Sequence, residues 1–400
     1  MADLTILMPC LNEAKTIAYC LQLAKQYAAR SEYDVELLVA DNGSTDDSIA
    51  IAEGIGARVI HVRQRGYGAA LIAGIKAARG RWIIFGDSDG SYDFSAIDTM
   101  VERLAAGADL VMGDRFSGGI ESGAMPFLHR YLGNPVLSQI GRLLYSSRVK
   151  DFHCGIRGLN RERFVDLDLS APGMEFASEI VVRAELAGFH IEQVPVVLKP
   201  DLRDRPPHLN TWRDGWRHLR FLLALSPEWS LLLPGLALMA LGLLMQLSIA
   251  TAPLDVFGVR LDIHTMLYGA GFLVVGFQLV VCALLVCSYW IRVGVRKEAA
   301  WYARFRSIFS ADVAVGLGVI LVLIGVLIGA AAFMGWGRDG FGNLDPVDVM
   351  RLVIPSVCLI AVGVQAVCLS VCLSLIMNYQ TTPEIRPMSS SRPVLPVGRA

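Results

Sequence analysis

Charged residues are scarce in this sequence of 400 residues, and neither sign dominates. Asp, Glu, Lys and Arg make up 18% of the chain against 54% hydrophobic residues, and the formal net charge at pH 7 is -1. This composition is too apolar for an ordinary soluble protein. A domain that binds nucleic acid carries a clear basic excess, so the charge balance excludes nucleic acid as an expected partner.

Cysteine pairing motifs and a signal peptide are also missing. The chain has 8 cysteines but no Cys-x-x-Cys motif, so we predict free thiols rather than a zinc site or a disulfide framework. The first residues, Met-Ala-Asp-Leu, lack the basic start and apolar run of a secretory signal. We therefore expect the first apolar span to target the chain.

Long uncharged runs dominate the second half of the sequence. Each has the ~20 apolar residues that are needed to cross a bilayer core, whereas buried core helices would be shorter and have a polar face. We therefore predict four transmembrane helices within residues 229–378. The runs are Leu231–Ala250, Thr265–Tyr289, Val313–Met334 and Leu352–Met377.

Basic residues around these runs predict their orientation. The segments before the first run and between the second and third runs are rich in arginine and lysine, whereas the other two links carry fewer basic residues, among them Arg260 and Arg338. The positive-inside rule then places the N-terminal domain and both chain ends in the cytoplasm, in a multi-pass protein of the inner cell membrane. The basic residues are Arg213, Arg217, Arg220, Arg292, Arg296, Lys297, Arg304 and Arg306.

Residues 1–205 alternate short apolar runs with helical patterns. Helices are expected from a cap at Asn12, after Asp46 or Asp47, and over Tyr67–Ala78. Continuous apolar strands predict a mainly parallel, doubly wound α/β sheet that is covered on both faces, with ligands beyond the carboxyl ends of its strands. The predicted strands are Leu4–Met8, Val35–Ala40, Arg58–Val62 and Trp82–Phe85.

Three polar clusters fall at those strand ends. Asp87 and Asp89 follow the fourth strand, and two carboxylates in that place suit Mg²⁺ or Mn²⁺ bridging to substrate phosphates. Alone, this Asp-x-Asp is also typical of a solvated acidic turn. The second cluster is a turn at residues 41–46. In the third, Gly66 and Gly68 open a helix, where glycines let backbone approach a phosphate.

Together, these motifs resemble the family-two glycosyltransferases of GT-A fold. The matching residues are Met8-Pro9-Cys10-Leu11-Asn12-Glu13, Val39-Ala40-Asp41-Asn42-Gly43-Ser44-Thr45-Asp46, Gly66-x-Gly68-Ala69 and Asp87-Ser88-Asp89. Three further motifs look like the polyprenyl-phosphate sugar synthases of the dolichyl-phosphate mannose and glucose synthase type. These are Gly113-Asp114-Arg115, Asp151-Phe152-His153-Cys154-Gly155-Ile156-Arg157 and Glu175-Phe176-Ala177-Ser178-Glu179.

The resemblance implies a role for each matching residue. On the donor side, the nucleotide sugar would contact Pro9, Asn12, Glu13, Asp41 and Gly68, with Arg205 and His208 where relatives show Arg-x-x-Gly-x-Ser-Lys. Asp87 and Asp89 would hold the metal. Asp89, Arg115 and Arg130 would serve catalysis, the two arginines by gripping the acceptor phosphate with their planar forks. Asn42 departs from the Asp-Asp that relatives often have, which leaves UDP-glucose and GDP-mannose both open as donors.

Two segments have the pattern of basic amphipathic helices with aromatic residues, which favour a bilayer interface. They are Pro126–Tyr145 and Asn210–Leu223. Burial against the N-terminal domain is the alternative for both. We predict an interface helix at residues 206–228 and a disordered cytoplasmic tail at residues 379–400, which is rich in Pro and Ser.

The sequence thus predicts inverting transfer of a hexose from a nucleotide diphosphate sugar to a polyprenyl phosphate at the cytoplasmic membrane face. A transport or flippase component is one alternative, but none of the four runs holds Asp, Glu, Lys, Arg or His. A processive polysaccharide synthase is another, but no Gln-x-x-Arg-Trp occurs. Gly325 and Gly329 have the spacing of close helix packing, so self-association of the chain is a further expectation.

Overall fold

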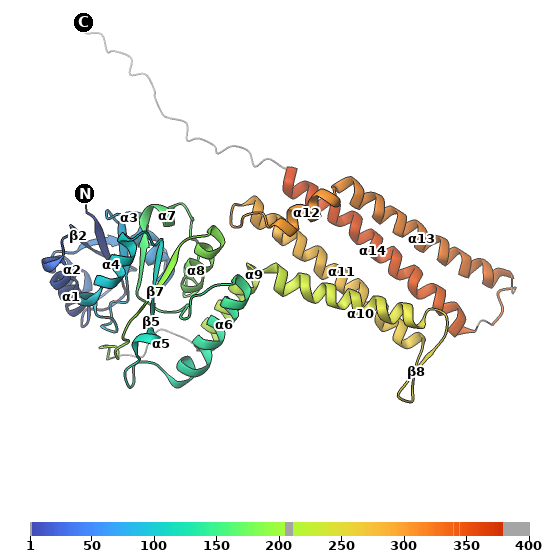
Figure 1. The fold of residues 1–400 in the computed structure, drawn as a ribbon, viewed down its shortest axis with the longest axis horizontal. Helices are drawn as coiled ribbons and strands as arrows, with labels where there is room; N and C mark the ends of the chain where they lie inside the picture. Colours follow the sequence, from blue (N-terminus) through green and yellow to red (C-terminus); the bar gives the residue numbers. More distant parts are fainter. Residues whose placement is uncertain (1, 205–210, 339, 344, 379–400) are drawn as a thin grey trace, which may run out of the picture. The chain divides into compact units, whose positions relative to one another are not determined.

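The computed structural model describes residues 2–204, 211–338, 340–343 and 345–378. The chain divides into two compact units (Figure 1). Unit 1 comprises residues 1–237 and 293–299, and unit 2 comprises residues 238–292 and 300–400. The tail predicted at residues 379–400 lies outside the described residues.

Unit 1 is built on a seven-stranded sheet in the order β3-β2-β1-β4-β6-β5-β7. β6 is antiparallel to both of its neighbours, and the other pairs are parallel. The predicted mainly parallel α/β fold is therefore confirmed. The strands are β1 (Leu4–Cys10), β2 (Val35–Asp41), β3 (Arg58–His61), β4 (Trp82–Phe85), β5 (Leu110–Asp114), β6 (Arg157–Asn160) and β7 (Ile191–Pro195).

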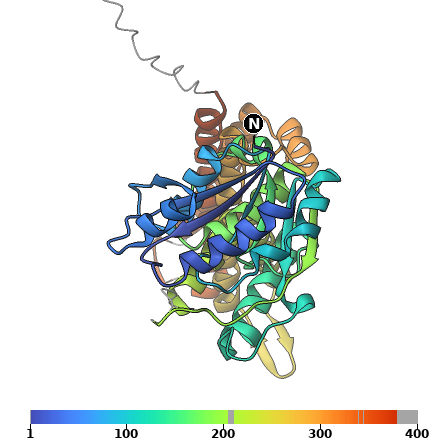
Figure 2. The ribbon, with the colours of Figure 1, turned by 90° about the vertical axis from the view of Figure 1, so that its left-hand side faces the viewer.

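Helices cover both faces of this sheet (Figure 2). The helices of unit 1 are α1 (Ile17–Arg30), α2 (Ser48–Ile55), α3 (Tyr67–Ala77), η1 (Phe94–Ala96), α4 (Asp98–Ala105), α5 (Arg115–Gly118), η2 (His129–Gly133), α6 (Asn134–Tyr145), α7 (Arg161–Val165), α8 (Phe176–Ala187), α9 (Thr211–Ala224) and η3 (Glu228–Leu232).

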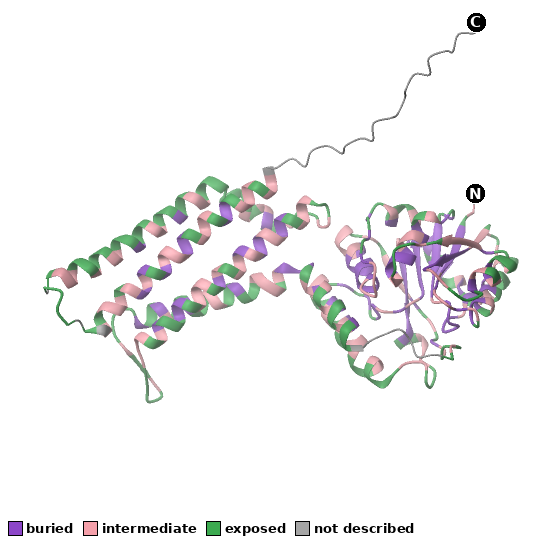
Figure 3. Ribbon diagram, turned by 180° about the vertical axis from the view of Figure 1, so that it is seen from behind, coloured by how far each residue is buried: buried purple, intermediate pink, exposed green. Residues whose placement is uncertain are grey.

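Both faces of β1 are buried, which explains its continuous apolar run. Ile6 and Met8 belong to a core cluster that includes residues of α1 and α4. Leu7 points to the other face, where a Cβ on Gly74 of α3 would lie 2.5 Å from the Leu7 side chain. Figure 3 shows the strands as the most buried part of unit 1. A strand that is covered on both sides has no polar face to present.

Unit 2 holds most of α10 (Leu233–Ile249) together with α11 (Ile263–Arg292), α12 (Ala300–Ile308), α13 (Ala311–Arg338) and α14 (Pro346–Asn378). A hairpin of β8 (Leu254–Val256) and β9 (Val259–Leu261) lies between α10 and α11. Within the part of the chain that the structure describes, four helical segments are long and apolar enough to span a bilayer, as predicted. They are Glu228–Ile249, Ile263–Arg292, Ala311–Arg338 and Val347–Met377.

Small residues let α13 and α14 pack closely. A Cβ on Gly318 would lie 2.7 Å from the Gly363 carbonyl oxygen, and one on Gly325 would lie 2.8 Å from the carbonyl oxygen of Ser356. Gly329 faces the same serine, since a Cβ there would lie 2.9 Å from the Ser356 hydroxyl. The Gly325-x-x-x-Gly329 motif therefore serves helix packing within one chain.

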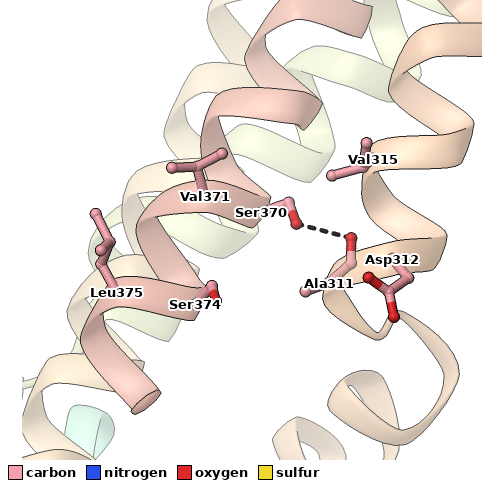
Figure 4. Close-up of a pocket in the computed structure, with 7 residues that line it drawn as sticks. All are labelled: Ala311, Asp312, Val315, Ser370, Val371, Ser374 and Leu375. Atoms are coloured by element: carbon pink, nitrogen blue, oxygen red, sulfur yellow. Dashed lines mark hydrogen bonds between the residues drawn. The ribbon is translucent and has the colours of Figure 1, made fainter. Parts of the chain in front are cut away.

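A small cleft opens where α13 begins beside the end of α14 (Figure 4). Ser370 donates a hydrogen bond to the Ala311 carbonyl oxygen at 2.7 Å on its wall, and Asp312 and Ser374 also line it. Its volume is about 270 Å³. None of the described residues that were predicted to bind substrate lines this cleft.

Candidate active site

Several of the predicted donor-side residues lie at the carboxyl ends of β1 and β2, beginning with Asp41. Its Oδ1 accepts a hydrogen bond from the Ser44 amide at 2.9 Å and its Oδ2 one from the Gly43 amide at 3.1 Å, while His61 Nδ1 lies 3.4 Å from Oδ2. Burial acts to raise the pKa of Asp41, but hydrogen bonds from Ser44, Gly43 and His61 outweigh it and leave the pKa below its ordinary value. Asp41 is therefore a fixed, ionised acceptor.

Asn12 joins the loop after β1 to the loop after β2. Its side-chain oxygen accepts a hydrogen bond from the Thr45 amide at 2.7 Å, and its own amide donates to the Ser44 hydroxyl at 2.9 Å. Its φ of 58° lies in the left-handed region, which Asn tolerates better than most residues. The predicted helix cap at Asn12 is wrong, because α1 starts at Ile17 with Thr16 before it.

Asn42, which departs from the Asp-Asp that the resemblance led us to expect, uses both the nitrogen and the oxygen of its side-chain amide. Its nitrogen donates to the carbonyl oxygens of Val62 and Gln64 at 3.3 and 2.7 Å, while its oxygen accepts from the Gly66 amide at 2.7 Å. A carboxylate could accept but not donate. Asn42 therefore holds the segment after β3 in place.

The glycines at the start of α3 have a packing role that was not predicted. A Cβ on Gly68 would overlap the carbonyl oxygen of Ala171, and one on Gly66 would overlap that of Pro172. Pro172 also accepts a hydrogen bond from the Ala69 amide at 3.0 Å. The chain itself thus fills the space on the Cβ side of Gly66 and Gly68, and the approach of a phosphate to this helix start stays a prediction.

The two predicted metal ligands lie in the turn that follows β4. Oδ1 of Asp89 accepts a hydrogen bond from the Ser91 amide at 3.0 Å and another from the Ser91 hydroxyl. The Asp87 carboxyl lies against Gly155. Burial, and then the negative charge of Asp89, raise the pKa of Asp87. Two carboxylates in one buried site repel each other, and a cation relieves that repulsion.

Pro9 links the first strand to the same turn, because its carbonyl oxygen accepts a hydrogen bond from the Ser88 hydroxyl at 2.7 Å. The structure thus brings Pro9, Asn12, Asp41 and the Asp87–Asp89 turn to one edge of the sheet.

Arg203 was not among the predicted site residues, but it completes this cluster. Its Nη2 lies 3.1 Å from Oδ2 of Asp89, and its Nε lies 3.0 Å from Oε1 of Glu13. Only 16% of its side chain is exposed. Arg203 is the first residue of the segment that was compared with the Arg-x-x-Gly-x-Ser-Lys motif of relatives. From that segment we had predicted Arg205 and His208, and not Arg203, as substrate-binding residues. Arg205 and His208 lie outside the described residues.

Arg115, the predicted ligand of the acceptor phosphate, is bound to Asp151. Its Nε and Nη2 donate to the two carboxylate oxygens at 2.6 and 2.7 Å, in a bidentate pair that is almost fully buried. The Arg115 amide also donates to Asp151, at 3.3 Å. Asp151 thus fixes the orientation of the guanidinium and offsets its charge.

A pair of histidines next to this ion pair was not predicted; His218 is buried and His153 is half-buried. The Ser178 hydroxyl lies 2.8 Å from Nδ1 of His218 on α9 and 3.4 Å from Nε2 of His153, and the two rings meet edge to face. Burial lowers the pKa of His218 to about 4 and that of His153 well below its ordinary value. Both rings are therefore neutral near pH 7. His153 and Ser178 belong to motifs that the sequence analysis identified, but no motif or pattern in the sequence pointed to His218.

Comparison with known proteins supports the motifs. Residues 5–167 match the family described as Glycosyl transferase family 2, and residues 285–377 match its C-terminal transmembrane region. The chain is 33% identical over 367 residues to the low-salt glycan biosynthesis hexosyltransferase Agl6 of Haloferax volcanii, covering 91% of this chain and 86% of that protein. The chain belongs to glycosyltransferase family 2.

Other similar proteins match about half of this family-2 glycosyltransferase. A dolichyl-phosphate hexose transferase of Haloferax volcanii is 29% identical, over 48% of this chain and 82% of that protein. A polyprenol monophosphomannose synthase of Mycolicibacterium smegmatis is 30% identical, over 40% of this chain and 66% of that protein. Glucosyl-3-phosphoglycerate synthase of Mycobacterium tuberculosis, solved with Mn²⁺ and UDP, aligns with a TM-score of 0.44 at 24% identity over 56% of this chain and 80% of that one.

The donor set of this glycosyltransferase fits a divalent cation that is shared with substrate. Among the described residues there is no group of three or more His, Cys, Asp or Glu side chains that could hold a metal alone. Mg²⁺ is commonly bound by one or two carboxylates plus phosphate oxygens and water. Asp87 and Asp89, with their mutual repulsion, match that requirement.

The amphipathic helices of this glycosyltransferase expose aromatic side chains. Phe127 and Tyr131 at η2 are 76% and 61% exposed, and Trp212 and Trp216 on α9 are 77% and 59% exposed. Tyr145, at the end of α6, donates a hydrogen bond to the Leu222 carbonyl oxygen at 2.5 Å and so ties α6 to α9. The two helices therefore form one assembly within unit 1 that presents exposed aromatic residues.

Arg130, the third predicted catalytic residue, lies on η2. Its guanidinium is 5.5 Å from the ring centre of Tyr131, a cation–π contact. Burial and then the charge of Arg115 lower the pKa of the adjacent His129. The structure therefore brings η2 close to Arg115.

Proposed function

We propose that this membrane glycosyltransferase transfers a hexose, with inversion, from a nucleotide diphosphate sugar to a polyprenyl phosphate at the cytoplasmic membrane face. The observation that carries the proposal is the acidic pair Asp87 and Asp89, which follows β4 at the carboxyl end of the strand and is in contact with Arg203. The names of the similar dolichyl-phosphate and polyprenol enzymes support the choice of acceptor.

The donor would bind along the ends of β1, β2 and β4. Asp41 presents an ionised carboxylate beside the loops that Asn12 joins, which suits the hydroxyls of a ribose. Asp87 and Asp89 would hold Mg²⁺ or Mn²⁺ against the diphosphate. When bound, the cation would offset the negative charge that develops on the departing nucleoside diphosphate.

The acceptor would approach from the side of η2, α6 and α9. Exposed aromatic residues at Phe127, Tyr131 and Trp212 suit the bilayer interface, where a polyprenyl chain is held. Arg115 and Arg130 supply positive charge for the lipid phosphate. Because Asp151 already binds two nitrogens of Arg115, that arginine would act mainly through its fixed position and its field.

The reaction needs little proton transfer. A lipid monophosphate is largely dianionic near neutral pH, since its second pKa is about 6. One phosphate oxygen attacks the anomeric carbon, the bond from that carbon to the nucleoside diphosphate breaks, and the anomeric configuration inverts. The protein contributes positioning and the neutralisation of two phosphate-bearing substrates.

The test is to incubate the full chain, purified in detergent, with polyprenyl phosphate, Mg²⁺ and radiolabelled UDP-glucose or GDP-mannose in separate reactions. We expect one labelled lipid product, which disappears when polyprenol replaces polyprenyl phosphate. A product that lengthens with time would instead indicate a processive polysaccharide synthase. The absence of any labelled product with every donor would contradict the proposal.

A further inference from the structure

A strap of residues 199–204 runs along the turn that holds the predicted metal ligands. The Lys199 amide donates to the Ser91 carbonyl oxygen at 3.0 Å, and the Leu202 amide donates to that of Asp89 at 2.9 Å. Gly90 has a φ of +87°, and a Cβ there would lie 2.8 Å from the Leu202 side chain. The strap therefore packs so closely against the turn that a side chain at position 90 would collide with Leu202.

The strap carries two cations that match two aspartates of the turn. Lys199 Nζ lies 3.1 Å from Oδ2 of Asp93, and Arg203 Nη2 lies 3.1 Å from Oδ2 of Asp89. The two pairs differ in burial, because side-chain exposure is 35% for Lys199 and 16% for Arg203. Arg203 is thus the more desolvated of the two, and its interactions are less screened by water.

Asp89 has one oxygen left for a metal, and Arg203 holds it. Oδ1 accepts both hydrogen bonds from Ser91, so Oδ2 is the atom that a divalent cation would take. The guanidinium already supplies Asp89 with positive charge, and it is anchored on the other side by Glu13. A cation on Oδ2 and the guanidinium of Arg203 compete for the same oxygen.

We propose that Arg203 occupies the metal side of Asp89 in the metal-free enzyme and that the divalent cation binds by displacing it. Glu13 keeps the displaced guanidinium beside the site. The inference rests on the proposed function only in placing the cation on Asp87 and Asp89. It makes Arg203 a positioning residue that stabilises the empty site and weakens metal binding in the absence of donor.

The experiment measures Mn²⁺ binding to the full chain in detergent, without nucleotide or lipid, by the electron paramagnetic resonance signal of free Mn²⁺. For Arg203→Gln we expect an affinity about tenfold higher than that of the unmodified chain, within the usual range of coupling between two sites. The matched control is Lys199→Gln, which removes one positive charge from the same strap. Its affinity should change by less than about threefold, because Lys199 contacts Asp93 and is more exposed to solvent.

Asp89→Asn separates the failure of this inference from that of the proposed function. If Asp89→Asn binds Mn²⁺ as tightly as the unmodified chain, the cation does not sit on Asp89, and both the metal assignment and the inference fail. If Asp89→Asn loses binding while Arg203→Gln resembles Lys199→Gln or binds more weakly, the competition with Arg203 is refuted and the metal site stands.

A measurement on the unmodified chain covers the case in which Arg203→Gln does not fold. Phenylglyoxal modifies accessible guanidinium groups, and mass spectrometry of the Arg203 peptide gives the rate at that residue. We expect Mn²⁺ to raise this rate several-fold, because the displaced side chain leaves its ion pair. An unchanged or lower rate with Mn²⁺ bound would overturn the proposal.

Discussion

Arg115 and Arg203 both pair with aspartates in unit 1, but the two pairs are built differently. The single guanidinium of Arg115 pairs with the single carboxylate of Asp151 through two short hydrogen bonds, and the two side chains are 8% and 0% exposed. Arg203 lies between two carboxylates, Glu13 and Asp89, through one nitrogen each.

The difference separates a structural ion pair from one at a binding site. In the buried bidentate pair, Asp151 offsets much of the charge of Arg115 and holds its guanidinium in place. Removing either partner leaves the other charge buried without a counter-charge in a medium of low dielectric. At the Asp87–Asp89 turn, two acidic groups lie side by side and a single arginine cannot neutralise both. An excess of negative charge in a buried site is a condition for recruiting a divalent cation.

Asp89→Ala tests the binding-site half of this comparison and should have the largest effect. Without Oδ2 of Asp89 the cation loses one of its two protein ligands, so turnover should fall at least about a hundredfold. The assay is transfer of radiolabelled sugar to polyprenyl phosphate, and thermal unfolding checks that the variant is folded. Asp89→Asn, which keeps the acceptor for Ser91, should be equally inactive. Near-normal turnover by a folded Asp89→Ala chain would refute the assigned site.

Asp151→Asn tests the structural role of the ion pair between Arg115 and Asp151. The variant leaves the buried Arg115 without a counter-charge, and breaking such a pair costs about 3–5 kcal/mol. Thermal unfolding in detergent, followed by tryptophan fluorescence, should therefore show a clear drop in melting temperature. Arg203→Lys supplies the contrast, because it retains a cation at the binding site, and it should melt close to the unmodified chain. Equal melting temperatures for Asp151→Asn and the unmodified chain would contradict the structural role.

The histidines beside the Arg115–Asp151 pair predict a pH dependence of stability. Burial lowers the pKa of His218 to about 4 from the ordinary 6.5. Between these values the unfolded chain binds a proton that the folded chain does not, so stability should fall as the pH drops from 6.5 toward 4 and stay level above 6.5. His218→Gln, which can still hydrogen-bond to Ser178, should lose less melting temperature between about pH 7.5 and 5. An identical acid-induced loss in the variant would exclude His218 as its source.

The exposed pair of Lys15 with Asp204 should show the smallest effect. Its side chains are 71% and 72% exposed, and ion pairs of this kind contribute little because water and salt screen them. Lys15→Ala should leave both the melting temperature and sugar transfer within experimental error. A drop comparable to that of Asp151→Asn would mean that exposure is a poor guide to the ion pairs of this protein.

Several features of the fold could be predicted because they depend on local sequence. The four spans follow from the length and hydropathy of their runs, and the strands β1, β2 and β4 from apolar runs that end in polar turns. Asp87 and Asp89 were identifiable as a pair because one residue separates them. The glycine motif at Gly66 and Gly68 was recognised, but its packing role was missed, because the segment that fills the space beside it lies far along the chain.

The sequence by itself determined the membrane spans, the parallel half of the sheet and the acidic turn after β4, since each depends on residues that are neighbours in the chain. Only the tertiary structure decided which distant side chains pair with one another in unit 1. Arg203 reaches Asp89, Arg115 reaches Asp151, and His218 reaches Ser178 across long sequence separations. Such partners are selected by the packing of distant elements, and no local pattern of residues encodes that packing.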